Sequence, residues 1–214
     1  MSKVICGLSV SVDGFITGCD PRPGHGLGDG GVLFDWYGSG DVPSTVFAGF
    51  RLSAPSVRVF DELASRVGAS LAGHTTYTDS DDFAGGAPHP TAPLVVLSHE
   101  DFPPANERQT IVSTGLADAV AEAKRLARGK DVGLMGGVLV TEALAAGLVD
   151  ELILHQVPVL LGAGRRFFHE LPRHIALRIR EVVSAPDVTH LHYLVEKTPP
   201  AEPAASATVQ GDAR

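Results

Sequence analysis

The chain has 214 residues, 44% of them hydrophobic, which is enough for one domain with a buried core. Its formal net charge is −8, and two short basic pairs, Lys124-Arg125 and Arg165-Arg166, are too little for a surface that binds nucleic acid. Apolar runs such as Val157 to Leu161 are far shorter than the roughly 20 residues that cross a membrane, and the start does not read as a signal peptide, so we expect a cytoplasmic protein outside the membrane.

The first third of the sequence predicts a central strand, a long loop and a helix. Val4 to Val12 is rich in β-branched and apolar residues and ends at Asp13-Gly14, as a strand closed by a turn does. Residues 17–49 are glycine-rich and irregular, and their aromatic residues favour a functional loop that folds over a site. Ser56 to Val67 carries apolar residues at helical spacing, and Gly68 ends this predicted helix.

Strands and helices alternate from residue 69 to residue 146. Helical spacing predicts one helix at Leu116 to Ala127 and a second from Gly137 to about Ala146. Buried strands are predicted around them, at Ala69 to Gly73, Pro93 to Ser98, Gln109 to Ser113 and Val132 to Met135. This alternation predicts an α/β fold with a mainly parallel sheet and helices on both of its faces.

Beyond Asp150 the pattern changes to strands only. Three are predicted, at Glu151 to Val157, Ala176 to Val183 and Thr189 to Glu196. We therefore expect antiparallel C-terminal strands at one edge of the parallel sheet. From residue 198 the chain consists largely of Pro, Ala, Glu, Ser and Gly with almost nothing to bury, so we predict a domain at 1–197 and a disordered tail at 198–214.

A pair of glycines, Gly136-Gly137, lies where a buried strand meets the start of a helix. Backbone N–H groups point outward at such a helix N-terminus, and the missing Cβ atoms let a phosphate approach closely. The pattern suits a dinucleotide pyrophosphate. A tight strand-to-helix turn without any ligand explains the pair about equally well.

Two stretches far apart in the chain form a recognisable set. One is Ser9-Val10-Ser11-Val12-Asp13-Gly14-Phe15-Ile16, and the other is Leu134-Met135-Gly136-Gly137-Val138-Leu139 running into Gly147-Leu148-Val149-Asp150-Glu151-Leu152. By their order and spacing they resemble the dihydrofolate reductase-like superfamily, and within it the reductase domain of riboflavin biosynthesis. The resemblance covers about residues 3–196. It implies a three-layer α/β sandwich of the dihydrofolate reductase type and hydride transfer from NADPH, or alternatively NADH, to a pteridine- or pyrimidine-like heterocycle or a related small molecule.

Two further segments resemble the family's contacts to the NADPH phosphates. Gly73-His74-Thr75-Thr76-Tyr77 is similar to a Gly-Arg-x-Thr-Tyr signature, and Val95-Val96-Leu97-Ser98-His99 to a segment that ends in Ser-Arg or Thr-Arg. The resemblance thus implies a cofactor site made by Gly73, His74, Thr76, Ser98, His99, Gly136 and Gly137. A histidine replaces the arginine in both segments, and it offers phosphate a weaker, pH-dependent partner. The choice between NADPH and NADH therefore stays open, and each histidine alone is equally well a solvated loop residue.

Asp13 and two aromatic residues of the long loop are the candidates on the substrate side. Asp13 follows the first strand, at the edge where parallel sheets bind ligands, and can orient a polar substrate group or relay a proton. Asp before Gly is also a common turn former, and the two roles are weighed equally once the resemblance is counted. Phe34 and Trp36 can wall a pocket for a planar heterocycle, although anchoring the loop to the core explains them slightly better.

Metal chemistry is not expected. His190 and His192 alternate with Leu191 and Tyr193 along a predicted strand and so share one face. No third ligand has matching spacing, so we predict an exposed polar face there and no metal. Cys6 and Cys19 are expected to be ordinary thiols.

The function predicted from the resemblance is that of a reductase acting on a small molecule, similar to 5-amino-6-(5-phosphoribosylamino)uracil reductase. That reaction needs a basic pocket for a ribose 5-phosphate, and Arg165-Arg166 is the one cluster that the sequence offers. A non-catalytic nucleotide- or ligand-binding protein with the same fold is the alternative. Relatives in this family often pair, so a homodimer is expected from the resemblance alone.

Overall fold

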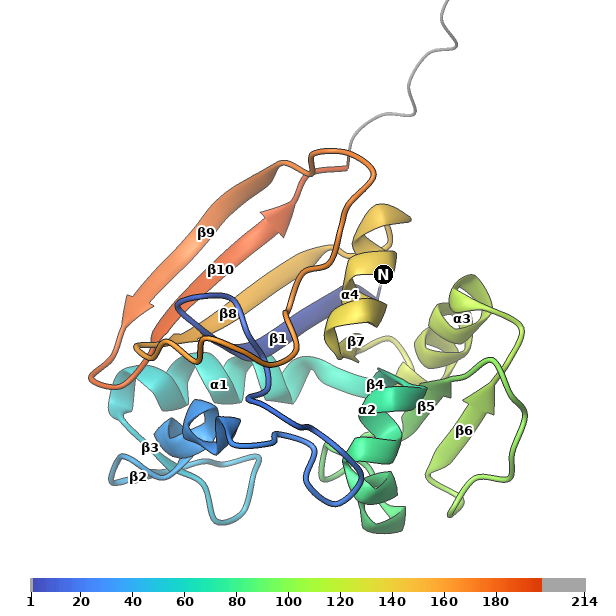
Figure 1. The fold of residues 1–214 in the computed structure, drawn as a ribbon, viewed down its shortest axis with the longest axis horizontal. Helices are drawn as coiled ribbons and strands as arrows, with labels where there is room; N and C mark the ends of the chain where they lie inside the picture. Colours follow the sequence, from blue (N-terminus) through green and yellow to red (C-terminus); the bar gives the residue numbers. More distant parts are fainter. Residues whose placement is uncertain (1, 198–214) are drawn as a thin grey trace, which may run out of the picture.

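An eight-stranded sheet forms the centre of the protein, in the order β6-β5-β4-β7-β1-β8-β10-β9 (Figure 1). The computed structural model describes residues 2–197, so the tail predicted at 198–214 lies outside the described residues. The strands of the sheet are β1 (Val4–Ser11), β4 (Val67–Gly73), β5 (Leu94–Leu97), β6 (Gln109–Val112), β7 (Asp131–Met135), β8 (Glu151–Val157), β9 (Leu177–Ser184) and β10 (Thr189–Val195). The helices are α1 (Ala54–Arg66), α2 (His74–Asp79), α3 (Leu116–Ala127) and α4 (Gly137–Ala145), with 3-10 turns η1 (Gly30–Tyr37) and η2 (Asp81–Gly85).

The direction of the strands follows the predicted pattern. The six strands from β6 to β8 in the order of the sheet pair in parallel with one another. Strand β10 pairs antiparallel with both β8 and β9. The α/β fold with a mainly parallel sheet and antiparallel C-terminal strands is therefore confirmed.

Helices cover both faces of the sheet, which gives the three layers. Along β1, Val4 and Cys6 are fully buried in the same core cluster as residues of α3 and α4. The alternate residues Ile5 and Gly7 face α1, and a Cβ atom built on Gly7 would lie 2.6 Å from Leu63 Cδ2 of that helix. Strand residues alternate between faces, so one strand supplies both core layers.

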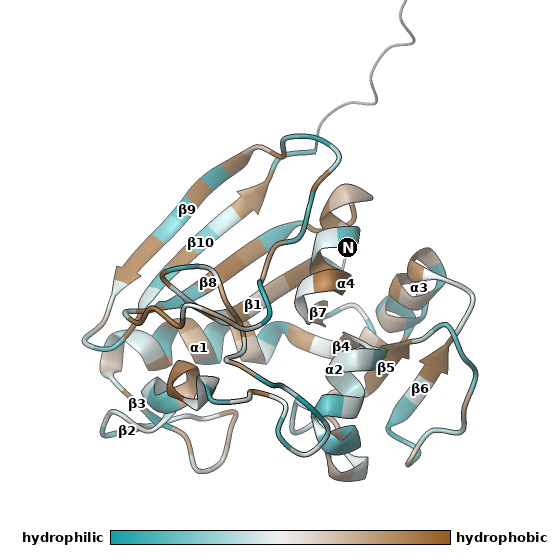
Figure 2. Cartoon of the chain, in the orientation of Figure 1, coloured by the Kyte–Doolittle hydropathy of each residue, from teal (hydrophilic) through white to brown (hydrophobic). Residues whose placement is uncertain are grey.

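Hydropathy along the strands matches their place in the sheet. Strands β1 and β5 are hydrophobic over most of their length, whereas β9 and β10 alternate between hydrophilic and hydrophobic residues (Figure 2). Inner strands of a parallel sheet are covered on both faces and read as continuous apolar runs. Strand β9 lies at the edge and is largely exposed.

The order of the strands opens a crevice at their carboxyl ends. The chain runs outward from β4 through β5 to β6, then returns to place β7 between β4 and β1. In open α/β sheets, ligands bind where the strand order reverses in this way. The ends of β4, β5 and β7 all meet at this point of the sheet.

Helix α2 and the start of β4 differ from the predictions. The residues after Gly73, expected as a loop, form helix α2. Strand β4 begins at Val67, directly after α1, and its pairing with β7 is shifted by a bulge between Val67 and Ala69. A Cβ on Gly68 would lie 2.4 Å from the carbonyl oxygen of Ala127, so the close approach of the end of α3 requires this glycine. The glycine lies inside a bulged strand, where such residues are common.

The exposed polar face predicted for His190 and His192 is wrong. His190 has 1% of its surface exposed, and its Nδ1 lies 2.8 Å from Nδ1 of His155. The Nε2 of His190 lies 3.0 Å from the hydroxyl of Ser56, so α1 covers this part of β10. The two-residue alternation was read correctly, but which face α1 covers depends on contacts between residues far apart in the chain.

His192 belongs to an ionic cluster around Glu151, at the other end of α1. The Glu151 side chain is fully buried, and its carboxylate lies 2.5 Å from Lys3 Nζ and 2.9 Å from both Arg66 Nη1 and His192 Nε2. Burial alone raises the pKa of Glu151, but the hydrogen bonds from His192, Arg66 and Lys3 outweigh it and hold that pKa well below its usual range. The cluster ties the C-terminal end of α1 to β8 and β10.

Three general features complete the description of residues 2–197. None of the helices there is both long enough and apolar enough to span a lipid bilayer. Cys6 and Cys19 are both free thiols, and only Cys6 is buried. Within the same part of the chain, no three potential ligand side chains gather as a metal site would require.

Candidate functional site

A cavity of about 740 Å³ opens at the carboxyl ends of the central strands, and we call it the polar cavity. Its floor is the end of β4 with α2, the residues after β5, and the junction of β7 with α4. The long loop and residues 165–169 close its other side. The lining residues are Leu8, Ser9, Ile16, Thr17, Gly26, Leu27, Phe34, Gly73, His74, Thr75, Thr76, Asp79, Ser80, Leu97, Ser98, His99, Met135, Gly136, Gly137, Val138, Leu139, Glu142, Arg165, Arg166 and His169.

The junction of β7 with α4 requires both of its glycines. Gly136 is the N-cap of α4 with φ +99°, a conformation that other residues rarely adopt. A Cβ on Gly136 would lie 2.4 Å from Thr76 Oγ1, and one on Gly137 would lie 2.6 Å from the carbonyl oxygen of Arg166. No side-chain hydrogen bond caps this end of α4. Its first backbone N–H groups, with the positive end of the helix dipole, therefore line the cavity without a side-chain partner.

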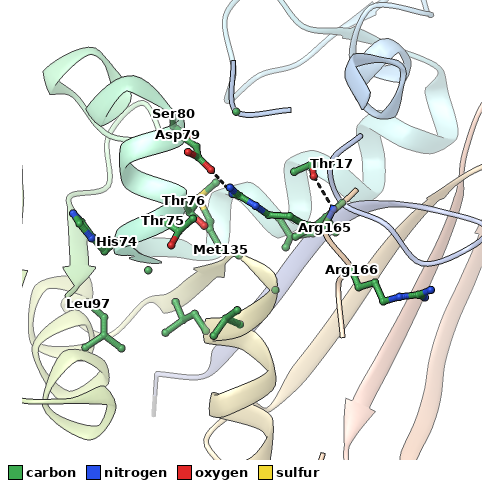
Figure 3. A pocket seen from close by; sticks show the side chains of 18 of the residues that line it. Thr17, His74, Thr75, Thr76, Asp79, Ser80, Leu97, Met135, Arg165 and Arg166 are labelled. Carbon is green, nitrogen blue, oxygen red and sulfur yellow. Dashed lines mark hydrogen bonds and ion pairs between the residues drawn. The ribbon is translucent and has the colours of Figure 1, made fainter. Parts of the chain in front are cut away.

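Helix α2 adds hydroxyl and imidazole groups to the same wall. Thr76 is half-buried, and His74 is exposed with its ring centroid 5.3 Å from that of Phe102 (Figure 3). The Asp79 carboxylate at the end of α2 pairs with Arg165. The predicted residues Gly73, His74 and Thr76 therefore come to the cavity together, on one short segment.

The segment after β5 brings Ser98 and His99 to the cavity that His74 also lines. Ser98 is buried, and its hydroxyl oxygen accepts a hydrogen bond of 3.0 Å from the backbone N–H of Glu100. This contact turns the chain and leaves His99 exposed at the edge of the cavity. All seven predicted cofactor residues thus line one cavity, and their roles remain predictions.

Arg165 and Arg166 line the cavity but do not form one cationic site. The Arg165 guanidinium points to Asp79, and its backbone N–H donates to the hydroxyl of Thr17 at 3.0 Å (Figure 3). The Arg166 side chain points the other way and lies over the ring of Phe15 at 4.8 Å. The sequence marked this pair as a basic cluster, but which charge is paired depends on the fold.

Asp13 lies outside the polar cavity. Its carboxylate accepts hydrogen bonds from the Ser11 hydroxyl at 2.6 Å and from the backbone N–H groups of Leu161 and Gly162 at 3.1 and 2.7 Å. The bond from Ser11 and those backbone donors lower its pKa to about 2. These contacts fit the structural alternative, in which Asp13 holds two turns together.

A second cavity, of about 390 Å³, adjoins the first on the side of α1, and we call it the aromatic pocket. Leu8, Ser9, Phe34 and Met135 line both cavities, so they meet at these residues. The long loop contributes much of the second wall. Its rings are those of Phe34, Tyr37, Phe47 and Phe50, with Phe60 from α1.

Phe34 and Trp36 have different positions although only Asp35 separates them. Phe34 is half-buried and lies where the two cavities meet. Trp36 has 1% of its surface exposed and lines neither cavity. Its indole N–H donates to the Ser9 hydroxyl at 3.0 Å, and its ring packs on Tyr37 and His155. Trp36 therefore anchors the loop to the core, the alternative that the sequence slightly favoured.

Several residues of the site were not predicted from the sequence. Thr17, Asp79 and Arg165 organise one side of the polar cavity, and His155 lies in the wall of the aromatic pocket. No local pattern marks Thr17, Asp79 or His155, because each takes its role from a partner far along the chain. The sequence showed Arg165 only as half of a basic pair. The long loop was the one usable signal, and it does line both cavities.

Comparison with known proteins shows the family to which the sequence is similar. The sequence matches the family described as the RibD C-terminal domain over residues 2–191. It is also 30% identical over 90 residues to the uncharacterised protein YwjB of Bacillus subtilis strain 168, a match that covers 42% of this chain and 51% of that protein. The chain thus matches about half the length of this curated relative.

Solved structures share the fold. A candidate riboflavin biosynthesis protein from Shewanella sp. PV-4 has a TM-score of 0.64 and 24% identity, with 92% of this chain and 99% of that chain covered. RibD of Acinetobacter baumannii has a TM-score of 0.55 and 15% identity, covering 92% and 58%. A pyrimidine reductase-like protein from Corynebacterium diphtheriae has a TM-score of 0.54 and 15% identity, covering 92% and 93%. These similarities confirm the predicted fold of the dihydrofolate reductase type.

Proposed function

The chain belongs to the RibD C-terminal domain family, and on this premise we propose that it is an oxidoreductase that binds a nicotinamide nucleotide in the polar cavity and reduces a small molecule. NADPH is the expected nucleotide, with NADH as the alternative. The bound nicotinamide supplies the hydride, and the protein positions both reactants and keeps water away.

The glycine junction of β7 with α4 carries the proposal. A pyrophosphate needs backbone N–H donors, a positive dipole end and room for close approach. Gly136 and Gly137 provide the room, since Cβ atoms there would meet Thr76 and the Arg166 backbone. The uncapped first turn of α4 provides the donors. The residues of this structure therefore fit a dinucleotide.

The exposed histidines are suited to the outer phosphate of NADPH. His74 and His99 stand at the rim of the polar cavity, one at the start of α2 and one after β5. Both have solvent around them and can donate a hydrogen bond to a phosphate without burying charge. Because each offers fewer donors than an arginine, we expect a smaller preference for NADPH over NADH than two arginines would give.

The reacting end of the cofactor belongs where the two cavities meet. Leu8, Phe34 and Met135 line both, and they can hold the flat nicotinamide ring by apolar contact. An acceptor in the aromatic pocket would then lie next to the ring. Tight packing around the two reactants favours transfer because it fixes their distance and orientation.

Calorimetric titration of the purified protein with NADPH and then NADH tests the proposal. We expect NADPH to bind at one site and the Gly136→Asp variant to lose at least about a hundredfold in affinity, since the new carboxylate occupies the phosphate position. Gly147→Asp is the matched control, because Gly147 also has a positive φ, of +69°, but lies after the other end of α4. Unchanged affinity in Gly136→Asp, or no binding of either nucleotide to the unaltered protein, contradicts the proposal.

A further inference from the structure

The aromatic pocket is walled by flat rings that lie near one another. Tyr37 and Phe50 stack with centroids 4.6 Å apart and planes 16° apart, and Phe47 and Phe50 stack at 5.2 Å and 14°. Phe60 meets Phe47 at 5.3 Å from the side of α1. Surfaces of this kind bury and stack on planar, apolar groups.

No side chain with a permanent charge lines this pocket in the described part of the chain. Its two titratable imidazoles, His89 and His155, both have lowered pKa values through burial, and that of His155 falls to about 3. Burial also raises the pKa of the Tyr37 hydroxyl to about 12. All three groups are therefore neutral near pH 7.

The cations nearest His89 are engaged elsewhere. Arg108 donates to the carbonyl oxygens of His89 and Ala92 at 2.9 and 3.0 Å. Lys130 Nζ donates to the carbonyl oxygen of Ser65 at 3.0 Å. Neither residue lines the pocket.

The two arginines of the polar cavity do not supply a phosphate site for this pocket either. Arg165 is paired with Asp79, which has only 9% of its side chain exposed. Arg166 points away from Arg165, as Figure 3 shows. A phosphate held in the aromatic pocket would lose its hydration without gaining a cation, which is strongly unfavourable.

His155 supplies the pocket with one adaptable polar atom. Its Nδ1 is engaged with His190 Nδ1 at 2.8 Å, and His190 Nε2 lies 3.0 Å from the Ser56 hydroxyl. A Cβ on Gly7 would lie 3.6 Å from His155 Nε2, so the absent side chain leaves this nitrogen facing the pocket. The pair has two tautomer arrangements, and Nε2 carries a proton in one and a lone pair in the other. It can thus donate to a ligand or accept from one while both rings stay neutral.

From these features we propose that the aromatic pocket binds a neutral, planar, largely apolar molecule of about two fused rings, without phosphate, whose polar atom meets His155 Nε2. The identification of this molecule as the hydride acceptor rests on the proposed function. Its chemical class rests on the pocket alone. The same argument disfavours a ligand whose phosphate would lie inside this pocket, because no cation is among the described residues that line it.

A matched pair of probes, 1-naphthol and 1-naphthyl phosphate, tests the class of ligand on the full chain without cofactor. We expect calorimetry to show naphthol binding at one site and the phosphate ester binding at least about thirtyfold more weakly. Trp36 is the single tryptophan and its ring contacts His155 and Tyr37 of the pocket wall, so its fluorescence should change with naphthol. Equal or tighter binding of the ester, or no binding of naphthol, overturns the proposal.

A variant that places a positive charge in the pocket wall provides a second test of the proposal. Phe50 is half-buried on the loop, so Phe50→Arg adds a cation to the wall, although it also removes the stacking of Phe50 on Tyr37 and Phe47. We expect this variant to bind naphthyl phosphate about tenfold more tightly than the unaltered protein does, through a charge-assisted contact. Phe168→Arg is the control, since Phe168 is 38% exposed and lines neither cavity. An equal gain in both variants contradicts a site in the aromatic pocket.

The NADPH titration separates the two proposals. Naphthol binding without binding of either nucleotide leaves the ligand class standing and removes the proposed function. Nucleotide binding without naphthol binding leaves the function standing and removes the ligand class.

Discussion

The two cavities adjoin, yet they are built in opposite ways. The polar cavity has glycines and short polar side chains at strand ends, beside apolar residues such as Leu97 and Leu139, whereas the aromatic pocket is walled by large rings that also form part of the core. Added side chains should therefore disturb the polar cavity most, whereas the removal of side chains should disturb the aromatic pocket most. Binding in the polar cavity can be altered with modest loss of stability, but the aromatic pocket cannot be opened without weakening the fold.

Phe60→Ala should have the largest effect on stability. Phe60 is 9% exposed and its ring meets those of Trp36, Tyr37, Phe47 and Phe50, so truncation leaves a cavity among them. We expect a loss of about 3–5 kcal/mol in the free energy of unfolding, measured with urea. Phe60→Leu should lose far less, and a loss below about 1 kcal/mol in the alanine variant would show that the rings are not part of the core.

The second largest effect should come from a fall in pH, which reduces the free energy of unfolding by protonating two histidines beside the aromatic pocket. Burial lowers the pKa of His155 to about 3 and of His190 to about 4, below the ordinary value of 6.5. Between the lowered pKa values and 6.5, the unfolded chain therefore binds more protons than the folded protein does. The contribution of these histidines to stability is fully present above about pH 6.5 and is lost as the pH is lowered. Each histidine contributes up to about 1.4 kcal/mol per pH unit in that range.

Urea unfolding at a series of pH values between about 7 and 5 measures this slope, above the range in which buried carboxylates take up protons. The His155→Met variant should have a smaller slope, because the contribution of one of the two histidines is removed. The exposed His174 provides a control, His174→Asn, which should leave the slope unchanged. A flat profile in the unaltered protein would mean that neither imidazole is held neutral.

Gly136→Ala tests the polar cavity with the smallest added side chain. The positive φ of +99° and the approach of Thr76 predict a loss of about 1–3 kcal/mol in unfolding free energy, together with weaker NADPH binding. Gly147→Ala has φ +69° and nothing within 4 Å of the new Cβ, so it suffers backbone strain alone. Comparison of the two by urea unfolding isolates the contact with Thr76, and equal losses would show that this contact relaxes freely.

Trp36→Phe should have the smallest effect. It keeps most of the ring but removes the hydrogen bond from the indole N–H to Ser9. We expect a loss of about 1 kcal/mol in unfolding free energy and unchanged NADPH affinity, because Trp36 lines neither cavity. A marked change in NADPH affinity would place Trp36 closer to the cofactor than its contacts indicate.

The residues that the family resemblance marked for the cofactor line one cavity, because its motifs are continuous stretches of chain. Gly73 to Thr76, Ser98-His99 and Gly136-Gly137 each follow a strand, and parallel strands bring their carboxyl ends to one edge. Helix α2 was missed because six residues carry too little periodicity to reveal a helix.

The residues expected to face a substrate were harder to place from the sequence, because their polar contacts reach residues far along the chain. Asp13 was left between two roles, and the bonds from Leu161 and Gly162 favour the structural one. Phe34 and Trp36 look alike in the sequence, and only the Ser9 contact separates a cavity wall from a core anchor.

Sequence by itself determined the α/β order, the antiparallel end of the sheet and the glycine junction, because these depend on local periodicity and on backbone freedom at single residues. Tertiary structure alone decided that β10 turns His190 toward α1, that Arg165 is paired with Asp79, and that a neutral aromatic pocket adjoins the polar cavity. The physical reason is that burial and charge pairing belong to contacts between distant residues. Ser56 and His190 are 134 positions apart, and no local pattern records that they meet.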